Sequence, residues 1–286
     1  MILSGKELSK QIKESIKTTI SCLHVEGRRT PGLVTIMVGD NPASKVYVAN
    51  KEKACEEVGI FNDIVTLPED TSEEELLYMI NYYNNNTAID GILIQLPLPQ
   101  HINSENVLKA IDPKKDVDGF HPQNVANLWL GNDCIKPCTP QGILDLLDYA
   151  EVDLEGKNVV VLGRSNIVGL PVAKMCLDRN ATVTICHSKT ADLAKITRSA
   201  DVLIVAIGKP KFVTADMIGE DAIVIDVGIN RDENGKLCGD VDYEYVSKYA
   251  KAITPVPGGV GPMTIACLLK NTMKCYFNHE GDIKIK

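Results

Sequence analysis

The stretch that decides the fold is VVVLGRSNIVGLP, residues 159–171. The β-branched, apolar run from Val159 to Leu162 predicts a buried strand, and Gly163 lets the chain turn tightly off it. A helical pattern follows directly, so the free amides at its start can hold a pyrophosphate. The motif departs from Gly-x-Gly-x-x-Gly, because Ser165 replaces the second glycine and Gly169 comes one residue late. Taken alone, the motif is a weak signal, and a simple tight turn between strand and helix is the alternative.

The end of the next predicted strand, Thr182 to Cys186, indicates which dinucleotide is bound. Enzymes that prefer NAD usually carry Asp or Glu there to bind the ribose hydroxyls, whereas this chain continues His187-Ser188-Lys189. No carboxylate is present to repel a phosphate. Arg164 and Ser188, with His187 or Lys189, are candidates for the 2′-phosphate of NADP, because a guanidinium fork suits that anion. Ser188 and Lys189 also suit a solvated cap of the following helix.

Short apolar runs rich in Val and Ile alternate with helical patterns along most of the chain, which is typical of α/β folds with parallel sheets. The predicted strands are 33–38, 63–67 and 91–96, then 159–162, 182–186, 202–207, 222–227 and 252–255. The later set predicts a doubly wound sheet.

A segment with little periodicity separates these two halves. Residues 112–140 are rich in Asp, Pro, Asn and Gly, so we expect the chain to cross between domains there. The predicted fold class is α/β with two domains. Residues 1–120 are expected to form an N-terminal three-layer α/β domain, and residues 121–262 a Rossmann-like dinucleotide-binding domain. A C-terminal helix, 263–286, returns to the first domain.

Composition narrows the class of protein further. The chain has 286 residues and a formal net charge of −8, with no basic stripe able to neutralise many phosphates, so nucleic acid is not an expected partner. Its longest apolar runs fall far below the ~18 residues of a membrane span, so neither membrane insertion nor secretion is expected. Its nine cysteines form no Cys-x-x-Cys pair. We expect buried thiols, a cytoplasmic location and no metal site.

The first domain carries a lysine in an unusual place. The strand 33–38 is followed by Asn41, a suitable N-cap, and by Pro42, which suits the first helical position. Tyr47 and Lys51 lie one turn apart on this helix, so both can reach one ligand. Lys51 interrupts an otherwise apolar stripe. It either extends out of the core to water or is held in a cleft for a purpose.

Two further polar residues are candidates for the same edge of the sheet. Gln95 ends the apolar run that begins at Gly91, and a buried amide needs a hydrogen-bonding partner. Asp118 lies in the sequence Asp116 to Phe120, where its carboxylate could bind an N–H edge of a ligand. The simpler alternatives are a structural partner in the loop for Gln95 and an ordinary turn role for Asp118.

Together these segments closely resemble the bifunctional methylenetetrahydrofolate dehydrogenase/cyclohydrolase family. Six separate motifs in the same order carry the resemblance through nearly the whole chain: Val38 to Ser44 with Tyr47 and Lys51, Gln95 to Pro99, Asp116 to Phe120, Pro137 to Pro140, Gly163 to Ser165, and Pro255 to Thr264.

The resemblance implies an activity and a set of site residues. The family oxidises 5,10-methylenetetrahydrofolate with NADP and hydrolyses the methenyl product to 10-formyltetrahydrofolate, typically as a homodimer. Lys51 would be central to the cyclohydrolase step, with Gln95 tuning and positioning it. Tyr47 would lie along the folate's aromatic ring, and Asp118 would bind the pterin edge. The matching cofactor positions are Gly163, Arg164, Ser165, Ser188 and Ile229, and the loop closing on nicotinamide and folate includes Pro257, Gly258, Gly259 and Thr264.

The inventory of residues agrees with this chemistry. Hydride loss from the methylene carbon gives a cation stabilised by two flanking nitrogens, so that step needs orientation more than acid/base help. Water attack on the cation needs a base, and a lysine in an apolar cleft beside a cation can lose its proton near neutral pH. Lys51 is the candidate.

Two rival interpretations remain. Another two-domain Rossmann dehydrogenase, acting on a hydroxy acid or an amino acid, would need an acid/base or carboxylate-binding set that we do not find in the sequence. An NADP-binding regulatory protein without activity would have no use for the set Tyr47, Lys51, Gln95 and Asp118. Oxidation of methylenetetrahydrofolate by the purified chain separates both rivals from the folate enzyme.

Overall fold

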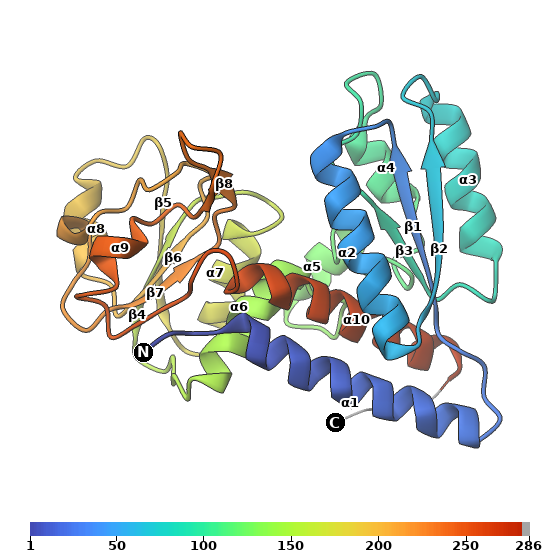
Figure 1. The fold of residues 1–286 in the computed structure, drawn as a ribbon, viewed down its shortest axis with the longest axis horizontal. Helices are drawn as coiled ribbons and strands as arrows, with labels where there is room; N and C mark the ends of the chain where they lie inside the picture. Colours follow the sequence, from blue (N-terminus) through green and yellow to red (C-terminus); the bar gives the residue numbers. More distant parts are fainter. Residues whose placement is uncertain (282–286) are drawn as a thin grey trace. The chain divides into compact units, whose positions relative to one another are not determined.

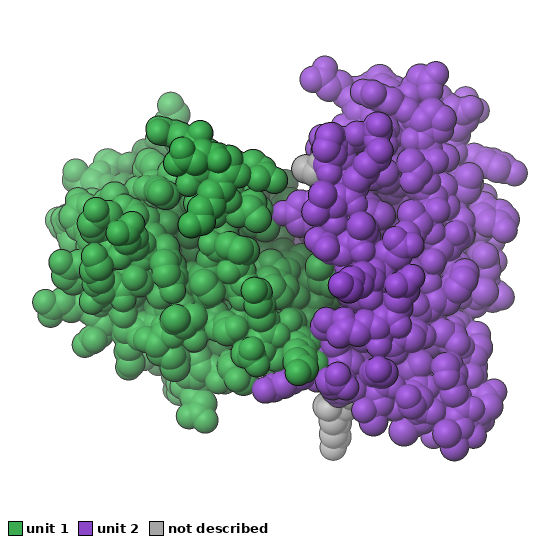
Figure 2. All heavy atoms as spheres, viewed as in Figure 1, with its two compact units in different colours: residues 1–10, 139–267 green, residues 11–138, 268–286 purple. Residues whose placement is uncertain are grey.

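The computed structural model describes residues 1–281 and divides into two compact units, coloured separately in Figure 2. Unit 1 comprises residues 1–10 and 139–267, and unit 2 comprises residues 11–138 together with the chain from Leu268 onward. The boundaries between the units, at 138/139 and 267/268, fall later in the chain than the expected domain boundaries at 120/121 and 262/263. The first ten residues also group with the dinucleotide-binding half, which no sequence pattern indicated.

Unit 2 is built on a parallel three-stranded sheet, shown in Figure 1. Its strand order is β2-β1-β3, with β1 at Gly32–Val38, β2 at Phe61–Leu67 and β3 at Gly91–Ile94. All three correspond to predicted strands. β1 and β3 are buried along their whole length, as expected for a parallel sheet covered on both faces.

Helices cover both faces of this sheet. On one face, α3 (Glu73–Asn85) and α4 (Ser104–Ala110) pack apolar side chains against β1 and β3 in a single core cluster. On the other lie α2 (Pro42–Val58) and the C-terminal part of α10 (Val260–His279). The helix α1 (Gly5–Val25) begins in unit 1 and continues in unit 2. The last residues of the expected 263–286 helix lie outside the described residues.

The segment expected to be irregular, 112–140, contains a helix. It is α5 (Pro122–Leu130), and the residues that suggested a loop are the ones that terminate it. Pro122 occupies the first turn, the His121 Nδ1 atom accepts the Gln123 N–H at 3.0 Å, and Gly131 ends the helix with φ at 74°. Caps of this kind stabilise even a short helix, since they satisfy its free backbone groups.

Unit 1 holds a five-stranded parallel sheet in the order β10-β7-β6-β4-β5. Its strands are β4 (Asn158–Leu162), β5 (Thr182–Cys186), β6 (Val202–Val205), β7 (Ile223–Asp226) and β10 (Ala252–Ile253). The chain starts at β4 and then winds outward in both directions, so the topological switch point lies between β4 and β6. In doubly wound sheets the ligand binds at the carboxyl edge at this point.

The remaining elements of unit 1 surround this sheet. They are α6 (Cys138–Tyr149), α7 (Gly169–Leu177), α8 (Leu193–Arg198), the 3-10 turn η1 (Ala215–Met217), α9 (Tyr243–Val246) and a hairpin of β8 (Asn230–Arg231) with β9 (Leu237–Cys238). The N-terminus extends the sheet at its β10 edge. Ile2 forms a parallel bridge with Ile253, and the Leu3 N–H donates to the Ile253 carbonyl at 2.9 Å.

Within residues 1–281, no helix has both the length and the apolar character that crossing a membrane requires. The nine cysteines are free thiols, of which Cys22 is exposed and Cys238 is partly exposed. The other seven are buried, as predicted, whereas the prediction of buried thiols was wrong for Cys22 and only partly right for Cys238.

Candidate functional site

Lys51 and Gln95 meet across the carboxyl edge of the unit 2 sheet. The Lys51 Nζ donates to the Gln95 Oε1 atom at 3.0 Å, and the Gln95 amide donates to the Leu96 carbonyl at 2.7 Å. The lysine comes from α2, whose start is capped as predicted: the Asn41 Oδ1 atom accepts the Ser44 N–H at 3.1 Å. The hydrogen bond to Gln95 therefore holds the Lys51 side chain at this edge of the sheet.

Tyr47 lies one turn before Lys51 on the same helix. Its side chain is 38% exposed, and burial of the remainder raises the pKa of the phenol above its ordinary value. The hydroxyl therefore stays protonated at neutral pH. Tyr47 can offer a ligand both a ring face and a hydrogen-bond donor.

Asp118 shares the electrostatic environment of Lys51. Burial raises the pKa of Asp118 to about 6; the positive charge of Lys51 opposes this shift, and the negative charge of Asp116 adds to it. Above that pH, Asp118 is a carboxylate in the electrostatic environment of the Lys51 side chain. A carboxylate accepts from N–H donors, which is what the edge of a nitrogen heterocycle offers.

Buried hydrogen bonds fix the loop that carries Asp118. The Asp116 carboxylate, which is 1% exposed, accepts from the His121 N–H at 2.8 Å and from the Asn124 amide at 2.9 Å. Gly119 has φ at 70°, and a Cβ there would lie 2.8 Å from the Ile135 carbonyl oxygen. The loop therefore has little freedom to change shape.

The helix α10 also holds this loop. The Asn271 amide donates to the Val117 carbonyl at 2.8 Å and to the Lys136 carbonyl at 2.9 Å, and it is buried. Sequence reasoning missed Asn271. The available signal was an amide within the largely apolar last helix, because a buried amide must have partners.

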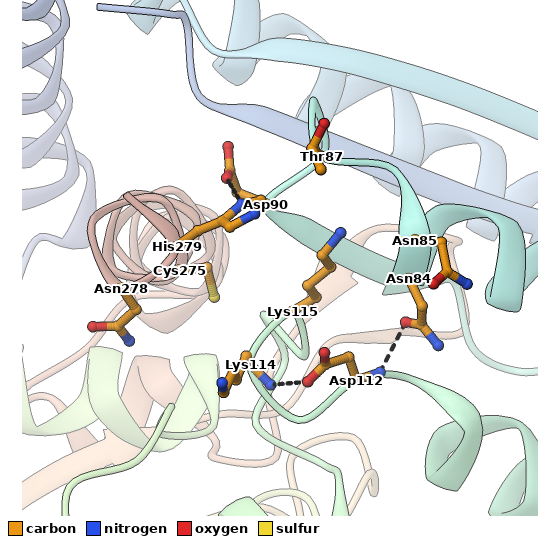
Figure 3. A pocket seen from close by; sticks show the side chains of 10 residues that line it. All are labelled: Asn84, Asn85, Thr87, Asp90, Asp112, Lys114, Lys115, Cys275, Asn278 and His279. Atoms are coloured by element: carbon orange, nitrogen blue, oxygen red, sulfur yellow. Dashed lines mark hydrogen bonds and ion pairs between the residues drawn. The ribbon is translucent and has the colours of Figure 1, made fainter. Parts of the chain in front are cut away.

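A polar cavity of about 270 Å³ lies at the opposite, amino edge of the same sheet, where Figure 3 shows its lining. Its wall contains Asp90, the residue just before β3, and none of the predicted site residues. The Asp90 carboxylate accepts two hydrogen bonds from Arg29, at 2.8 and 2.6 Å, and one from His279 at 2.9 Å. Lys115 donates to two backbone carbonyls. These charges are engaged in holding the fold together, so we place the chemistry at the Lys51 edge.

In unit 1, the turn after β4 has the shape of a phosphate cradle. Gly163 has φ at 125°, and a Cβ on it would lie 2.2 Å from the Ala206 carbonyl oxygen. A Cβ on Gly169 would lie 2.3 Å from the Gly163 oxygen. Both glycines are thus required for close backbone approach, including the one that comes late in the motif. The Ser165 hydroxyl accepts the N–H groups of Val168 and Gly169, at 3.2 and 3.3 Å.

Arg164 and Ser188 lie on neighbouring strand ends. Leu162 of β4 pairs with Cys186 of β5, so each candidate lies two residues beyond a paired position. Both are exposed. Over residues 1–281, the Arg164 guanidinium has no hydrogen bond or ion pair to a protein group, which leaves its donors available to an anion.

The remaining predicted residues also belong to unit 1. Ile229 is 50% exposed on the loop after β7. The Gly258 carbonyl accepts from the N–H groups of Gly5 and Lys6, at 2.9 and 3.2 Å. Gly5 has no room for a side chain, because a Cβ there would lie 1.8 Å from the Gly259 oxygen. The segment Pro257 to Thr264 is therefore packed on the start of α1.

Two family models match this chain, one over each half. Residues 3–118 match the tetrahydrofolate dehydrogenase/cyclohydrolase catalytic domain, and residues 137–280 match the NAD(P)-binding domain of the same family. The chain belongs to the tetrahydrofolate dehydrogenase/cyclohydrolase family. This confirms the resemblance carried by the six sequence motifs.

Individual relatives of this family agree over almost the full length. The bifunctional protein FolD of Streptococcus thermophilus is 56% identical over 272 residues, which cover 95% of this chain and 96% of the relative. The crystal structure of the bifunctional FolD enzyme from Campylobacter jejuni is 52% identical with a TM-score of 0.95, covering 97% and 99% of the two chains. The Trypanosoma brucei FolD structure, solved with NADP and an inhibitor, is 39% identical with a TM-score of 0.93, covering 97% of each chain.

The tetrahydrofolate dehydrogenase/cyclohydrolase fold thus divides the predicted residues into two sets. Unit 2 holds Tyr47, Lys51, Gln95 and Asp118, of which the structure joins Lys51 to Gln95 directly and to Asp118 through charge. Unit 1 holds the predicted cofactor positions and the 257–264 loop. No group of three or more His, Cys, Asp or Glu residues suited to a metal ion occurs in the part of the chain that the structure describes.

Proposed function

We propose that this chain oxidises 5,10-methylenetetrahydrofolate with NADP and then hydrolyses the 5,10-methenyl cation to 10-formyltetrahydrofolate. The observation that carries the proposal is the hydrogen bond between Lys51 and Gln95 beside Asp118, at the carboxyl edge of the catalytic-domain sheet. The relatives named above are bifunctional enzymes by name, which supports the same pair of reactions.

In the hydrolytic step, Lys51 acts on the attacking water. Water adds to the carbon between N5 and N10 and gives up one proton to a base. The carbon–N5 bond then breaks while the remaining hydroxyl proton of the adduct passes to N5, which leaves the formyl group on N10. The Lys51 amine, in its neutral form, accepts the proton of that water. Gln95 holds the amine at the sheet edge through its carbonyl oxygen. Tyr47 supports the ring system of the substrate, and Asp118 accepts from its N–H edge.

In the oxidative step, the protein residues orient the reactants. When bound, NADP supplies the acceptor for the hydride lost from the methylene carbon. The residues present fit this cofactor, because Gly163 and Gly169 form a cradle that side chains would fill and Ser165 orders the amides at its edge. No acid or base is required at that carbon, since the flanking nitrogens stabilise the cation.

We assign the choice of NADP over NAD to Arg164 and Ser188. They follow paired positions on β4 and β5, and the segment 187–189 contains no carboxylate that would repel a 2′-phosphate. Unit 2 is accordingly the folate-binding unit and unit 1 the NADP-binding unit, with Ile229 and the 257–264 loop bordering the cofactor.

The family resemblance further supports three proposals about the protein in the cell. The chain acts as a homodimer in the cytoplasm, and its 10-formyl product supplies one-carbon units for purine biosynthesis. Size-exclusion chromatography with light scattering tests the dimer independently of activity.

A spectrophotometric assay tests the proposed function. The purified chain is mixed with methylenetetrahydrofolate and either NADP or NAD, and both the reduced nicotinamide and the methenyl absorbance are followed. We expect NADP reduction, with the methenyl compound decaying faster than its spontaneous hydrolysis. An absence of NADP reduction contradicts the dehydrogenase assignment, and methenyl decay at the spontaneous rate contradicts the cyclohydrolase.

A further inference from the structure

Two buried carboxylates, Asp226 and Asp240, lie close together at the carboxyl edge of the unit 1 sheet, beside β6 and β7. Asp240 is 0% exposed and Asp226 is 2% exposed. Asp226 is the last residue of β7, and Asp240 follows the β8–β9 hairpin. Neither belongs to the motifs that identified the family. A buried carboxylate is costly unless hydrogen bonds satisfy it, so their partners show what they do.

Asp240 gathers four donors from two separate loops. Its Oδ2 atom accepts the N–H groups of Ile207 and Gly208, at 2.7 and 3.0 Å. Its Oδ1 atom accepts the Lys209 N–H and the Asn230 side-chain amide, both at 2.8 Å. Three consecutive backbone N–H groups therefore converge on one carboxylate, an arrangement that resembles the nests in which proteins bind anions. Here the anion is part of the chain.

Asp226 holds Asp240 in place. Its Oδ1 atom accepts the N–H groups of Gly228 and Asp240, both at 2.9 Å, and its Oδ2 atom accepts the Val241 N–H at 3.0 Å. The packing leaves no space around this pair. A Cβ on Gly228 would lie 2.4 Å from the Asp240 carboxylate, and one on Gly239 would lie 1.8 Å from Asp226 Oδ2. Asp240 therefore has one position available to it.

The two loops that Asp240 joins both border the cofactor cradle. The segment 206–209 follows β6, the strand beside β4 at the switch point. Its Ala206 carbonyl is the atom against which Gly163 packs. Asn230 directly follows Ile229, a proposed NADP contact. Asp240 thus connects the wall of the cradle beside β6 to the wall beside β7.

We propose that Asp240 is a positioning residue for NADP, which it serves by fixing the 206–209 loop and Asn230 before the cofactor arrives. The inference rests on the proposed NADP site in unit 1. A wall that is already ordered has no conformational entropy left to lose on binding, so the cofactor binds more tightly to it. Without the carboxylate, the three N–H groups lose their common acceptor, and the loop must be reordered by the ligand.

The variant Asp240→Asn tests this directly. Each carboxylate oxygen of Asp240 accepts two hydrogen bonds. An asparagine NH2 group in place of either oxygen cannot accept them, and its own hydrogens would face the two N–H donors. We expect the Kd for NADP, measured by calorimetry, to rise about tenfold or more. Hydrolysis of added methenyltetrahydrofolate, which uses Lys51 in unit 2 and needs no NADP, should remain near the parent rate.

Two further variants keep the test decisive. Asn230→Ala removes a single side-chain donor from the surface of the network, so it should fold and weaken NADP binding in the same direction by a smaller factor. Asp201→Asn is the matched control. Asp201 also accepts a backbone N–H, from Asn158 at 2.7 Å, but at the amino edge of the same sheet, and it should bind NADP as the parent does.

The possible outcomes distinguish a failure of the positioning role from a failure of the proposed function on which it rests. Weaker NADP binding in Asp240→Asn and Asn230→Ala, with cyclohydrolase activity retained, supports the role. If the parent binds NADP and these variants bind it equally well, the positioning role is overturned while the proposed function stands. Equal losses of both activities in a folded Asp240→Asn also overturn it. If Asp240→Asn does not fold, an unchanged Kd in Asn230→Ala decides against the role. Failure of the parent to bind NADP overturns the proposed function itself.

Discussion

Replacing Lys51 with Met should separate the two activities of this enzyme. Met keeps much of the length and the apolar stem of the lysine but removes the amine that donates to Gln95. Loss of a general base costs about 10²- to 10⁴-fold in rate, or roughly 2.7–5.5 kcal/mol of transition-state stabilisation at ~1.36 kcal/mol per tenfold change. The cyclohydrolase rate should therefore fall at least ~100-fold.

The dehydrogenase should lose much less. Its only expected loss is the hydrogen bond at the Gln95 oxygen, and Gln95 is partly exposed, so water can take the place of the amine. Hydrogen bonds replaced by water are worth about 0.5–1.5 kcal/mol net, which limits the effect to roughly tenfold. Methenyltetrahydrofolate should then accumulate as the end product.

The assay follows methenyl absorbance and reduced nicotinamide in the same reaction. Lys53→Met is the matched control, because Lys53 lies two residues further on the same helix and is exposed. Conversion of methenyltetrahydrofolate at near the parent rate, above the spontaneous background, would show that Lys51 is not the base. If both activities vanish in a folded variant that binds NADP, the main role of Lys51 is to hold the folate.

Four other perturbations have defined outcomes. Arg164→Ala should raise KM for NADP by about ten- to a hundredfold with little effect on NAD; equal changes for both would refute the 2′-phosphate contact. Asp118 binds its proton more tightly in the folded chain, with a pKa of about 6 against an ordinary value near 3.8, so substrate affinity should increase as pH rises through about 6. The stability that protonated Asp118 contributes is fully present below about pH 4 and is lost as the pH rises from about 4 to about 6. In Asp118→Asn, neither the substrate affinity nor the free energy of unfolding should change over this pH range because of residue 118. Asn271→Ala removes the amide donor from the Lys136 carbonyl and from the Val117 carbonyl, which keeps the Cys138 thiol. It should lower the free energy of unfolding by about 1–3 kcal/mol in a urea titration, with a higher KM for folate; an unchanged KM would show that the loop holds its shape unaided. Gly163→Ala would place a Cβ 2.2 Å from a carbonyl oxygen, so calorimetry should show loss of NADP binding while methenyl hydrolysis continues, and a parent-like Kd would show that the cradle can widen.

Local sequence patterns were sufficient to predict helices and strands where an apolar periodicity coincides with a residue that starts or ends the element. The start of the helix Pro42–Val58 was predicted at the right residue, since a cap residue, a proline and an apolar stripe all agree. All strands of both parallel sheets were predicted to within a few residues, because burial on both faces produces continuous apolar runs. The helix α5 was missed because Pro122 and Gly131, which lie at its two ends, are also typical of loops.

Candidate site residues could be predicted where a polar residue interrupts a local apolar pattern. They could not be predicted where a residue contacts backbone groups in distant segments. Lys51 and Gln95 were predicted as site residues because each interrupts an apolar pattern, and the structure shows a hydrogen bond between them across 44 positions of sequence. Asp240 looks like an ordinary turn residue, and Asn271 has its partners 154 and 135 positions away. Only the folded chain reveals that such residues hold a loop, because their partners are backbone groups that carry no sequence signal.

The bridge between Ile2 and Ile253 also sets an order of events during synthesis. The Met1 ammonium donates to the Lys251 carbonyl, 250 positions further along the chain. A ribosome adds ~5–20 residues per second, so the first residues wait roughly 12–50 s for the strand beside which they lie. During that interval Ile2 and Leu3 have no sheet to join, and the large sheet cannot close its β10 edge. The β10 edge of the NADP-binding sheet can thus be closed only after Ile253 has been made, although its partner Ile2 precedes it by about 250 positions.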